Sequence, residues 1–489
     1  MTRIAALLLP LVLSACIHRS RVAETLPPAP ARYAAARGAA EPRSGAERSA
    51  GDMNARKAAE VGRWWRVFKD TTLDSLMSQA LADNLTIEQT WTRLEQARAS
   101  LTLARAGWWP TLSAKGDVGR SRTAMKLGDL ESSFDRDTLA FSLTAAYEID
   151  LWGKVRYASK AAKLELQASE DDVRAAYLSV SAQVLDTYFL AAELRAQLLL
   201  LRQAERSRGQ QLELVRRRYD EGVVTALDMY QAQQNLATAR AQQHLYRRQL
   251  GAAQTALAVL AGRVPGQETG GALDRLPHQV TDLPPGLPSQ LLLRRPDLQA
   301  AHRRLFAADA RIGQAVAGHY PQLTLSASIG YQFDPAAMVW SILGSLLVPI
   351  FQGNRVAADV DLKRAQLRQA LAGYRATLLQ ALKEVEDALV TGREMEQRVK
   401  WLEQKVAAAE GALRMSTDQY TQGLTTFLQV LTAEQTVYTA RSELLSARRE
   451  LVSARVQLAR ALGGGWMERE MKQRQQRAQS DAPAPKEGS

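Results

Sequence analysis

Residues 374–420 read YRATLLQALKEVEDALVTGREMEQRVKWLEQKVAAAEGALRMSTDQY, and they place small or apolar side chains at alternating steps of four and three. The series starts at Tyr374, Leu378 and Ala381 and continues to Tyr420. An apolar repeat of about 3.5 residues keeps one seam of a helix against its neighbour over many turns, as in a coiled coil. The stretch therefore predicts one long helix that packs along a narrow edge.

The same pattern occurs a second time, 201 positions earlier in the chain. There the seam starts at Val173 and ends at Tyr219; it turns polar at Glu205 and Arg208 and then recovers. In both copies a short glycine turn follows, and a second apolar seam runs back. The chain thus contains one long helical hairpin twice, and the second copy runs from about residue 355 to residue 461.

The predicted helices are too long for a compact domain. The first runs from about residue 155 to residue 219, which corresponds to about 100 Å at about 1.5 Å per residue. The hairpins must therefore form either an extended rod or the staves of a tube.

A pair of predicted strands precedes each hairpin. In the first half, residues 111–120 alternate weakly, residues 121–137 read as a polar loop, and residues 139–149 alternate clearly between apolar and polar. In the second half, strands are expected over residues 323–333 and 338–351. A helix precedes each pair, so each half reads helix, strand, strand, long helix, return helix.

Strands of this length are long enough to cross a bilayer at a tilt, which takes about 9–11 residues. Open sheet edges are not tolerated in lipid, and barrels formed by one chain start at about eight strands. A membrane-spanning sheet therefore requires an oligomer: two chains would give about eight strands, and three would give about twelve with room for a pore. The alternative is a soluble four-stranded domain attached to a coiled coil.

The N-terminus reads as a secretory signal. Arg3 precedes an apolar run that ends at Leu13, and the only cysteine of the chain, Cys16, follows two small residues. The ending Leu13–Cys16 resembles the lipobox of bacterial lipoproteins, which implies that residues 1–15 are removed and that Cys16 carries a covalent lipid. Ile17 is not acidic, which in such proteins suggests retention in the outer membrane. A plain signal peptide with an incidental cysteine is the alternative.

The remaining boundaries follow from composition. Residues 16–60 are rich in Ala, Arg and Pro and predict an extended tether. The first repeat is expected over residues 61–262 and the second over residues 294–466, with a linker rich in Gly and Pro over residues 263–293. The charged residues 467–489 predict a disordered tail.

Charge and residue usage point away from enzymes and nucleic-acid binding. The net charge is +12, but Arg and Lys are interspersed with Glu and Asp along the helices. The five histidines are scattered, and no metal-ligand spacing, phosphate-binding loop or nucleophile motif is present. We expect no catalysis, no metal and no cofactor other than the lipid on Cys16.

Several short motifs, in this order and spacing, resemble the TolC/OprM family, and more narrowly its NodT-type outer-membrane lipoproteins. They are Trp65 with Phe68, Arg294-Arg295-Pro296-Asp297, Tyr320-Pro321, Phe351-Gln352-Gly353, Tyr420-Thr421-Gln422-Gly423 and Ala461-Leu462-Gly463-Gly464-Gly465-Trp466. The resemblance spans about residues 60 to 466.

The resemblance implies a fold that is mainly α-helical with a transmembrane β part. It implies a homotrimer with a twelve-stranded outer-membrane β-barrel, a twelve-helix periplasmic α-barrel, and an equatorial region that gathers the tether, the linker and the C-terminal segment. Such proteins are lipid-anchored exit ducts of tripartite efflux pumps and export small molecules passively. Their partners are a periplasmic adaptor protein and an inner-membrane transporter.

The competing interpretation is a lipid-anchored periplasmic adaptor or a coiled-coil scaffold. An adaptor needs one hairpin between the halves of β-rich domains. This chain has two hairpins with a strand pair before each, which favours the duct.

The resemblance also implies that the hairpin turns dock the adaptor. The candidate docking residues of the first turn are Tyr219, Gly222 and Val223, and those of the second are Gly423 and Leu424. Each glycine also has a purely structural explanation, because a tight turn needs its backbone freedom.

The resemblance also implies a gate that closes the tube at its periplasmic tip, with candidates Asp228, Tyr420, Leu428 and Thr432. Asp228 and Tyr420 could share a hydrogen bond between neighbouring hairpins. Relatives can carry an arginine at the position of Thr425 and aspartates at those of Gln429 and Thr432, whereas all three residues are neutral here. We therefore expect a gate made by packing of Tyr420 and Leu428, although Leu428 could also be an ordinary turn-packing residue.

Overall fold

The computed structural model describes residues 63–127, 130–266, 295–333, 336–463 and 467–480, together with Val22 and Leu276. The predicted lipid site Cys16, the tether up to residue 60 and most of the linker lie outside the described residues. The chain divides into two compact units, which we describe one at a time.

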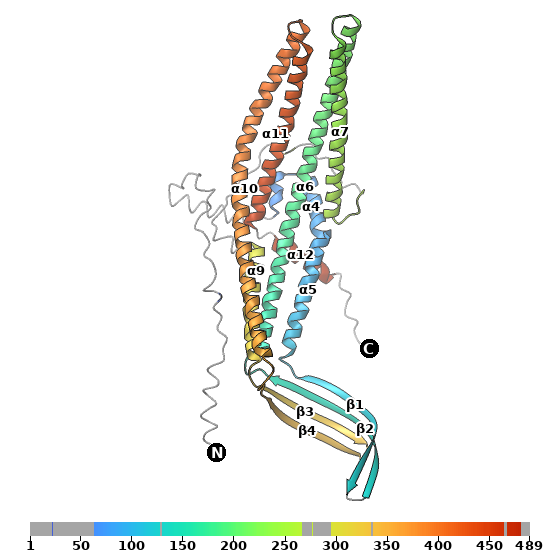
Figure 1. Cartoon of the computed structure of the whole chain (residues 1–489), viewed down its shortest axis with the longest axis vertical. Helices are drawn as coiled ribbons and strands as arrows, with labels where there is room; N and C mark the ends of the chain where they lie inside the picture. The colour runs from blue at the N-terminus through green and yellow to red at the C-terminus, as the bar shows by residue number, and fades with distance from the viewer. Residues whose placement is uncertain are drawn as a thin grey trace, which may run out of the picture. The chain divides into compact units, whose positions relative to one another are not determined.

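The first unit contains a four-stranded antiparallel sheet with the strand order β1-β2-β3-β4 (Figure 1). The strands are β1 (Thr111–Leu127), β2 (Leu130–Ile149), β3 (Gln322–Phe333) and β4 (Ala336–Leu347). Each half of the chain therefore contributes one adjacent strand pair, as the sequence predicts.

The expected polar loop over residues 121–137 is wrong. β1 and β2 stay paired as far as Leu127 and Leu130, so nearly all of this segment is strand. Arg122 lies 2.6 Å from Asp135 of the opposite strand, and such cross-strand ion pairs stabilise a hairpin that is polar on both faces. Composition indicated a loop because the segment lacks apolar alternation.

The fourth strand is shorter than predicted. β4 ends at Leu347 rather than at residue 351. Pro349 follows two residues later, and proline has no backbone N–H to donate to a ladder. The apolar residues 348–351 therefore connect β4 to the next helix without regular secondary structure.

One face of the sheet is apolar and exposed. In β3, every second residue from Leu325 to Phe333 is exposed, and the residues that alternate with them are half-buried. Trp340 and Ile342 of β4 pair with residues 329 and 327, so they share this face, and they are 69% and 74% exposed. An exposed apolar band on alternate strand positions is typical of a lipid-facing barrel wall.

Four helices meet the strands in the first unit: the C-terminal part of α5 (Leu85–Ala106), most of α9 (Pro296–Ala317), and the beginnings of α6 (Lys154–Asp220) and α10 (Arg355–Thr421). Trp152 stacks on Tyr320 at a centroid distance of 4.9 Å and donates its indole N–H to the carbonyl of Pro321 at 2.6 Å. These contacts join the strand–helix junctions of the two halves.

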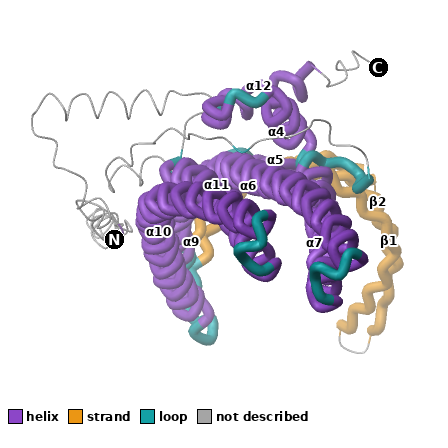
Figure 2. Tube along the Cα trace, turned by 90° about the horizontal axis from the view of Figure 1, so that it is seen from above, coloured by secondary structure: helices purple, strands orange, loops and turns teal. Residues whose placement is uncertain are grey.

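The second unit contains the two hairpins, and the predicted duplication is confirmed. α6 and α10 are both 67 residues long, and their ends differ by 201 positions. The return helices α7 (Ala226–Leu260) and α11 (Phe427–Leu462) begin with the same offset. Seen from above in Figure 2, the four helices follow one another along a curved row in the order α10, α11, α6, α7.

Among the helices that the structure describes, none is both long and apolar enough to cross a membrane.

The polar residues that interrupt the first seam contact polar groups of α7 and α11. Arg208 is 3% exposed and donates to the carbonyl of Asn235 at 3.1 Å and to the side chain of Gln435 at 3.0 Å. Glu205 accepts from Arg240 and Gln243 of α7 at 2.8 and 2.6 Å. The break in the apolar pattern is therefore a set of specific contacts to α7 and α11.

The second unit also holds shorter helices: η2 (Trp64–Phe68), α4 (Thr71–Asp83) and α12 (Met467–Ser480). The predicted disorder of the tail is wrong for the residues of α12. Met467 and Met471 are spaced by one helical turn and are both buried, and Glu470 lies 2.9 Å from Arg63. The sequence did not predict this helix, because two buried methionines leave no periodic apolar pattern.

Candidate functional site at the hairpin tips

The two hairpin turns have the same backbone geometry. In the first, Gly222 adopts a φ of 74°, and the N–H of Val223 donates to the carbonyl of Arg218 at 2.8 Å. In the second, Gly423 adopts a φ of 79°, and the N–H of Leu424 donates at 2.8 Å to the carbonyl five residues before it. A left-handed residue after a helix end is strongly favoured to be glycine, so both glycines are required by the turn itself.

Each turn presents one aliphatic side chain to solvent. Val223 is 66% exposed and Leu424 is 73% exposed, at equivalent places in the two turns. Tyr219 of the first tip is 41% exposed. These five predicted docking residues thus lie at the ends of the hairpins, and docking itself stays a prediction.

Tyr420 lies in an apolar cluster that joins the two hairpins. It is only 7% exposed, and its ring lies 5.6 Å from that of Phe427. The cluster takes residues from all four helices of the tip: Leu212, Val215, Ala232, Tyr420, Phe427, Val430 and Leu431. The guanidinium of Arg218 covers the Tyr420 ring at 4.8 Å, a cation–π distance. Within the described chain its hydroxyl has no hydrogen-bond partner.

Asp228 is the third residue of α7 and completes the N-terminal capping box with Thr225. Its carboxylate accepts from the backbone N–H and the hydroxyl of Thr225 at 3.0 and 2.8 Å, and its own N–H donates to that hydroxyl at 3.4 Å. This reciprocal capping box satisfies N–H groups that the helix leaves open. Within one chain, Asp228 therefore binds Thr225 and not Tyr420; their hydrogen bond stays a prediction for contacts between subunits.

The other gate candidates lie on the exposed side of α11. Leu428 is 56% exposed and takes no part in the apolar cluster beneath it, so it is not an ordinary turn-packing residue within the chain. The hydroxyl of Thr432 donates to the carbonyl of Leu428 at 2.9 Å, and the hydroxyl of Thr425 donates to the side chain of Gln429. The neutral residues at the positions of the usual charges are thus bonded locally.

Comparison with known proteins identifies the family to which this chain belongs. The family model described as outer membrane efflux protein matches residues 76–263 and 287–464, which is more than half of the chain. The chain belongs to the outer membrane efflux protein family.

Two relatives match this efflux protein along most of their length. It is 32% identical over 481 residues to outer membrane protein OprJ of Pseudomonas aeruginosa, covering 95% of this chain and 96% of OprJ. It is 29% identical over 427 residues to the probable efflux pump outer membrane protein TtgC of Pseudomonas putida, covering 86% and 88%.

A solved structure agrees with the fold. The outer-membrane channel OprN superimposes with a TM-score of 0.82 at 27% identity, over 90% of this chain and 98% of OprN. The predicted family, the fold class and the outer-membrane location are therefore confirmed. The adaptor interpretation is set aside, because its domain arrangement differs from that of this family. The family consists of efflux channel proteins and not of enzymes.

Sequence reasoning missed two residues of the tip. Arg218 is the last of three consecutive arginines before the first turn, and Phe427 is the first residue of α11. The steps of three and four did identify Tyr420, but a periodic pattern does not say which partner covers a ring.

Sequence reasoning also missed a buried carboxylate in α11, two turns from the second tip. Glu434 of α11 is 7% exposed, and burial raises its pKa although the charge of Arg208 opposes this. Burial likewise raises the pKa of Tyr438, to about 12. The signal was the polar residue Arg208 in the first seam, which requires polar partners on the facing helix.

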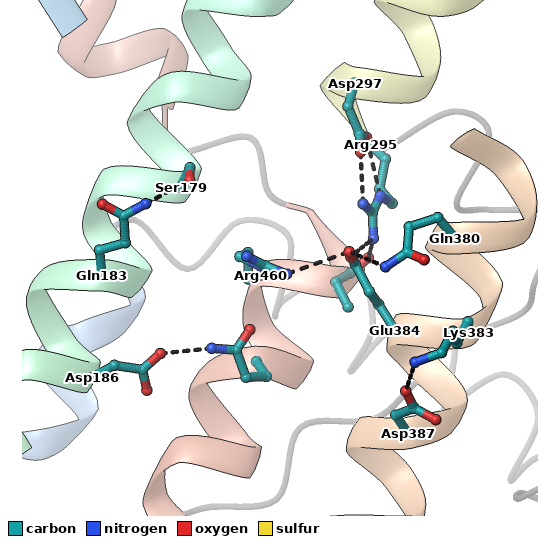
Figure 3. Close-up of polar contacts among 12 residues, drawn as sticks. Ser179, Gln183, Asp186, Arg295, Asp297, Gln380, Lys383, Glu384, Asp387 and Arg460 are labelled. Carbon is teal, nitrogen blue, oxygen red and sulfur yellow. Dashed lines mark hydrogen bonds and ion pairs between the residues drawn. The ribbon is translucent and has the colours of Figure 1, made fainter. Parts of the chain in front are cut away.

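A second polar network surrounds the motif that opens α9 (Figure 3). The guanidinium of Arg295 lies 2.6 Å from Asp297 and 2.8 Å from Glu384 of α10, and Arg460 of α11 lies 3.4 Å from Glu384. Burial disfavours the charge of Arg295, but the two carboxylates outweigh it, so the pKa of Arg295 is raised. The motif thus joins α9, α10 and α11. Among the described residues, no group of His, Cys, Asp or Glu is arranged to hold a metal ion.

Proposed function

We propose that this outer membrane efflux protein is the exit duct of a tripartite pump and conducts small molecules passively through the outer membrane. The observation that carries the proposal is the repeated unit itself, a strand pair followed by a hairpin of about 100 Å. TtgC is named as an efflux pump component and OprN as a channel, which supports the same function here.

The proposal includes a homotrimer. β1 and β4 are the two edges of the four-stranded sheet, and among the described residues each has one side without a paired strand. Their outward face carries large apolar side chains, so in lipid these edges must be covered by other copies of the sheet. Three copies give about twelve strands, which leaves room for a pore.

The proposed partners are a periplasmic adaptor, which contacts the hairpin tips, and an inner-membrane transporter, which supplies the energy. Val223 and Leu424 suit this role because they are exposed aliphatic side chains on rigid turns, where a partner helix can cover them. The proposal also includes a lipid on Cys16, whose sequence context motivates it.

The proposed gate is formed by packing at the second tip. Tyr420 holds the two hairpins together from within, and Leu428 extends from α11 on the exposed side. The local bonding of Thr425 and Thr432 supports an uncharged aperture.

Expression of the full chain in a Gram-negative host tests the function. We expect a heat-modifiable oligomer in the outer-membrane fraction that conducts ions in planar bilayers. A soluble product without conductance would contradict the proposal. Labelling with radioactive palmitate, compared between the wild type and Cys16→Ser, tests the lipid separately.

A further inference from the structure

A cavity of about 710 Å³ lies where β4 leads into α10, within the first unit. Its wall comes from the first residue of α6, the end of α9, the first residue of β3 and the first turns of α10. Four of its lining side chains are cations, Lys154, Arg311, Arg355 and Lys363, and Asp359 is the one carboxylate among them. The cavity is therefore basic.

Two of the four cations already have partners. Lys154 lies 2.9 Å from Glu148, and Arg311 lies 2.8 Å from Glu165. The two cations of α10 have no carboxylate partner among the residues that the structure describes. With these two glutamates and the lining aspartate counted, four cations face three carboxylates, which leaves one positive charge in excess per chain.

The N-terminus of α10, which lines this cavity, differs from the equivalent N-terminus of α6 in the first repeat. At the start of α6, the carboxylate of Asp150 accepts from the N–H groups of Val155 and Arg156 at 3.1 and 3.0 Å. The offset of 201 positions puts Phe351 at the equivalent place before α10, where it is 87% exposed. No side chain of the described residues accepts from the first N–H groups of α10. The first long helix thus has its own anion. The second presents the same N-terminus, with its positive dipole end, beside two cations that have no carboxylate partner in the described part of the chain.

The cavity opens on the face of the sheet opposite Leu325 and Ile329, where β3 carries polar residues and β4 carries both serines and apolar residues. Gln322 and Leu347 both line it and are direct partners across β3 and β4. Ser326 and Ser328 follow Gln322 at alternate positions of β3, whereas the exposed apolar side chains of this strand point the other way. If the apolar face meets lipid, as the proposed function requires, the cavity faces the lumen of the duct.

We propose that this cavity binds a small organic anion as it passes through the duct. A carboxylate or phosphate group interacts with Arg355 and Lys363, and the apolar body lies against Leu347, Pro349 and Val356. The assignment rests on the proposed function and adds a substrate class to it. Three copies of the cavity in a trimer would form a basic ring just inside the barrel.

Current block by benzoate tests the assignment. Trimers of the full chain are placed in planar bilayers with potassium chloride, and the current is recorded while benzoate, or the neutral benzamide, is added. We expect benzoate and not benzamide to reduce the wild-type current. In Arg355→Gln/Lys363→Gln, the half-blocking concentration should rise about tenfold or more, because two charge-assisted contacts are lost.

Lys160→Gln/Lys400→Gln is the matched control. It removes the same charge from exposed positions of α6 and α10 that do not line the cavity, and it should keep the wild-type response to benzoate. Equal half-blocking concentrations in the wild type and the cavity variant would overturn the assignment, as would equal block by benzamide. A wild type that conducts potassium chloride but ignores benzoate contradicts the cavity alone, whereas one that conducts nothing contradicts the proposed function.

A second variant guards against misfolding of the first. Phe351→Asp places a carboxylate where the first repeat carries one and leaves every cation of the cavity in place. We expect it to conduct potassium chloride and to lose sensitivity to benzoate, because the introduced carboxylate accepts from the first N–H groups of α10, as Asp150 does in α6, and its negative charge repels benzoate from the cavity. Retained sensitivity in this variant would contradict the assignment.

Discussion

The two hairpin tips share one backbone and differ in what they bury. Tyr219 and Tyr420 stand at equivalent positions before equivalent glycine turns, yet Tyr219 is 41% exposed and Tyr420 is 7% exposed. The first tip is capped by the Thr225–Asp228 box, whereas Thr426 of the second makes no side-chain cap. The two repeats thus share the turn. The second tip places its tyrosine in the apolar cluster between the hairpins, whereas the first tip is stabilised by its own capping box.

The largest expected difference comes from removing each tyrosine. Tyr420→Ala deletes a buried ring from the cluster that joins the four helices, which should cost about 3–5 kcal/mol locally. Tyr219→Ala, its matched control, removes an exposed ring and should cost less than about 0.5 kcal/mol. Hydrogen exchange of the tip amides in the trimer measures both. Equal protection in the two variants would show that the tips do not differ as described.

Protonation of Glu434 should tighten the contact between the hairpins. Burial raises its folded pKa above the ordinary value of 4.5, so its contribution to stability is full below that pH and is lost as pH rises through the folded pKa. Glu434→Gln, which mimics the protonated form, should stabilise the chain above this window by about 1–2 kcal/mol. The urea midpoint of helical unfolding at about pH 5 and about pH 8 measures the change. If the wild type were more stable at about pH 8 than at about pH 5, and Glu434→Gln removed this difference, the result would contradict the prediction.

The sequence predicts those features that follow a periodic pattern, and it does not predict those that depend on contacts between distant residues. The seams, the turns and the offset of 201 were readable because helix periodicity repeats over many turns. The polar strand ends over residues 121–137 and the helix α12 were not, because cross-strand ion pairs and two buried methionines leave no periodic pattern. At the site, spacing located Tyr420. The burial of Glu434 depends on α6, whose Arg208 lies 226 positions earlier in the chain, too far for any local pattern.

Substitutions at the helix caps should differ less in their cost to stability. Thr225→Ala removes the hydroxyl bonds of the capping box and leaves the backbone N–H of residue 225 to donate to Asp228, so it should cost about 1 kcal/mol, whereas Thr426→Ala removes no side-chain bond and should cost less than about 0.5 kcal/mol. Hydrogen exchange at the first turns of α7 and α11 distinguishes the two. If both substitutions had the same effect, the difference in capping would have no energetic consequence.

The smallest expected effect is that of Tyr420→Phe. The hydroxyl of Tyr420 has no partner within the described chain, so its removal should leave the packing intact and change conductance little. A marked rise in current would instead indicate the hydrogen bond to Asp228 of a neighbouring subunit.

The single-channel conductance of Tyr420→Ala tests the central claim most directly, with Tyr219→Ala and the wild type recorded under identical conditions. If the chain is a duct closed by packing at the second tip, Tyr420→Ala conducts more than the wild type and Tyr219→Ala conducts the same. Unchanged current in Tyr420→Ala, or an equal rise in both variants, would contradict the account.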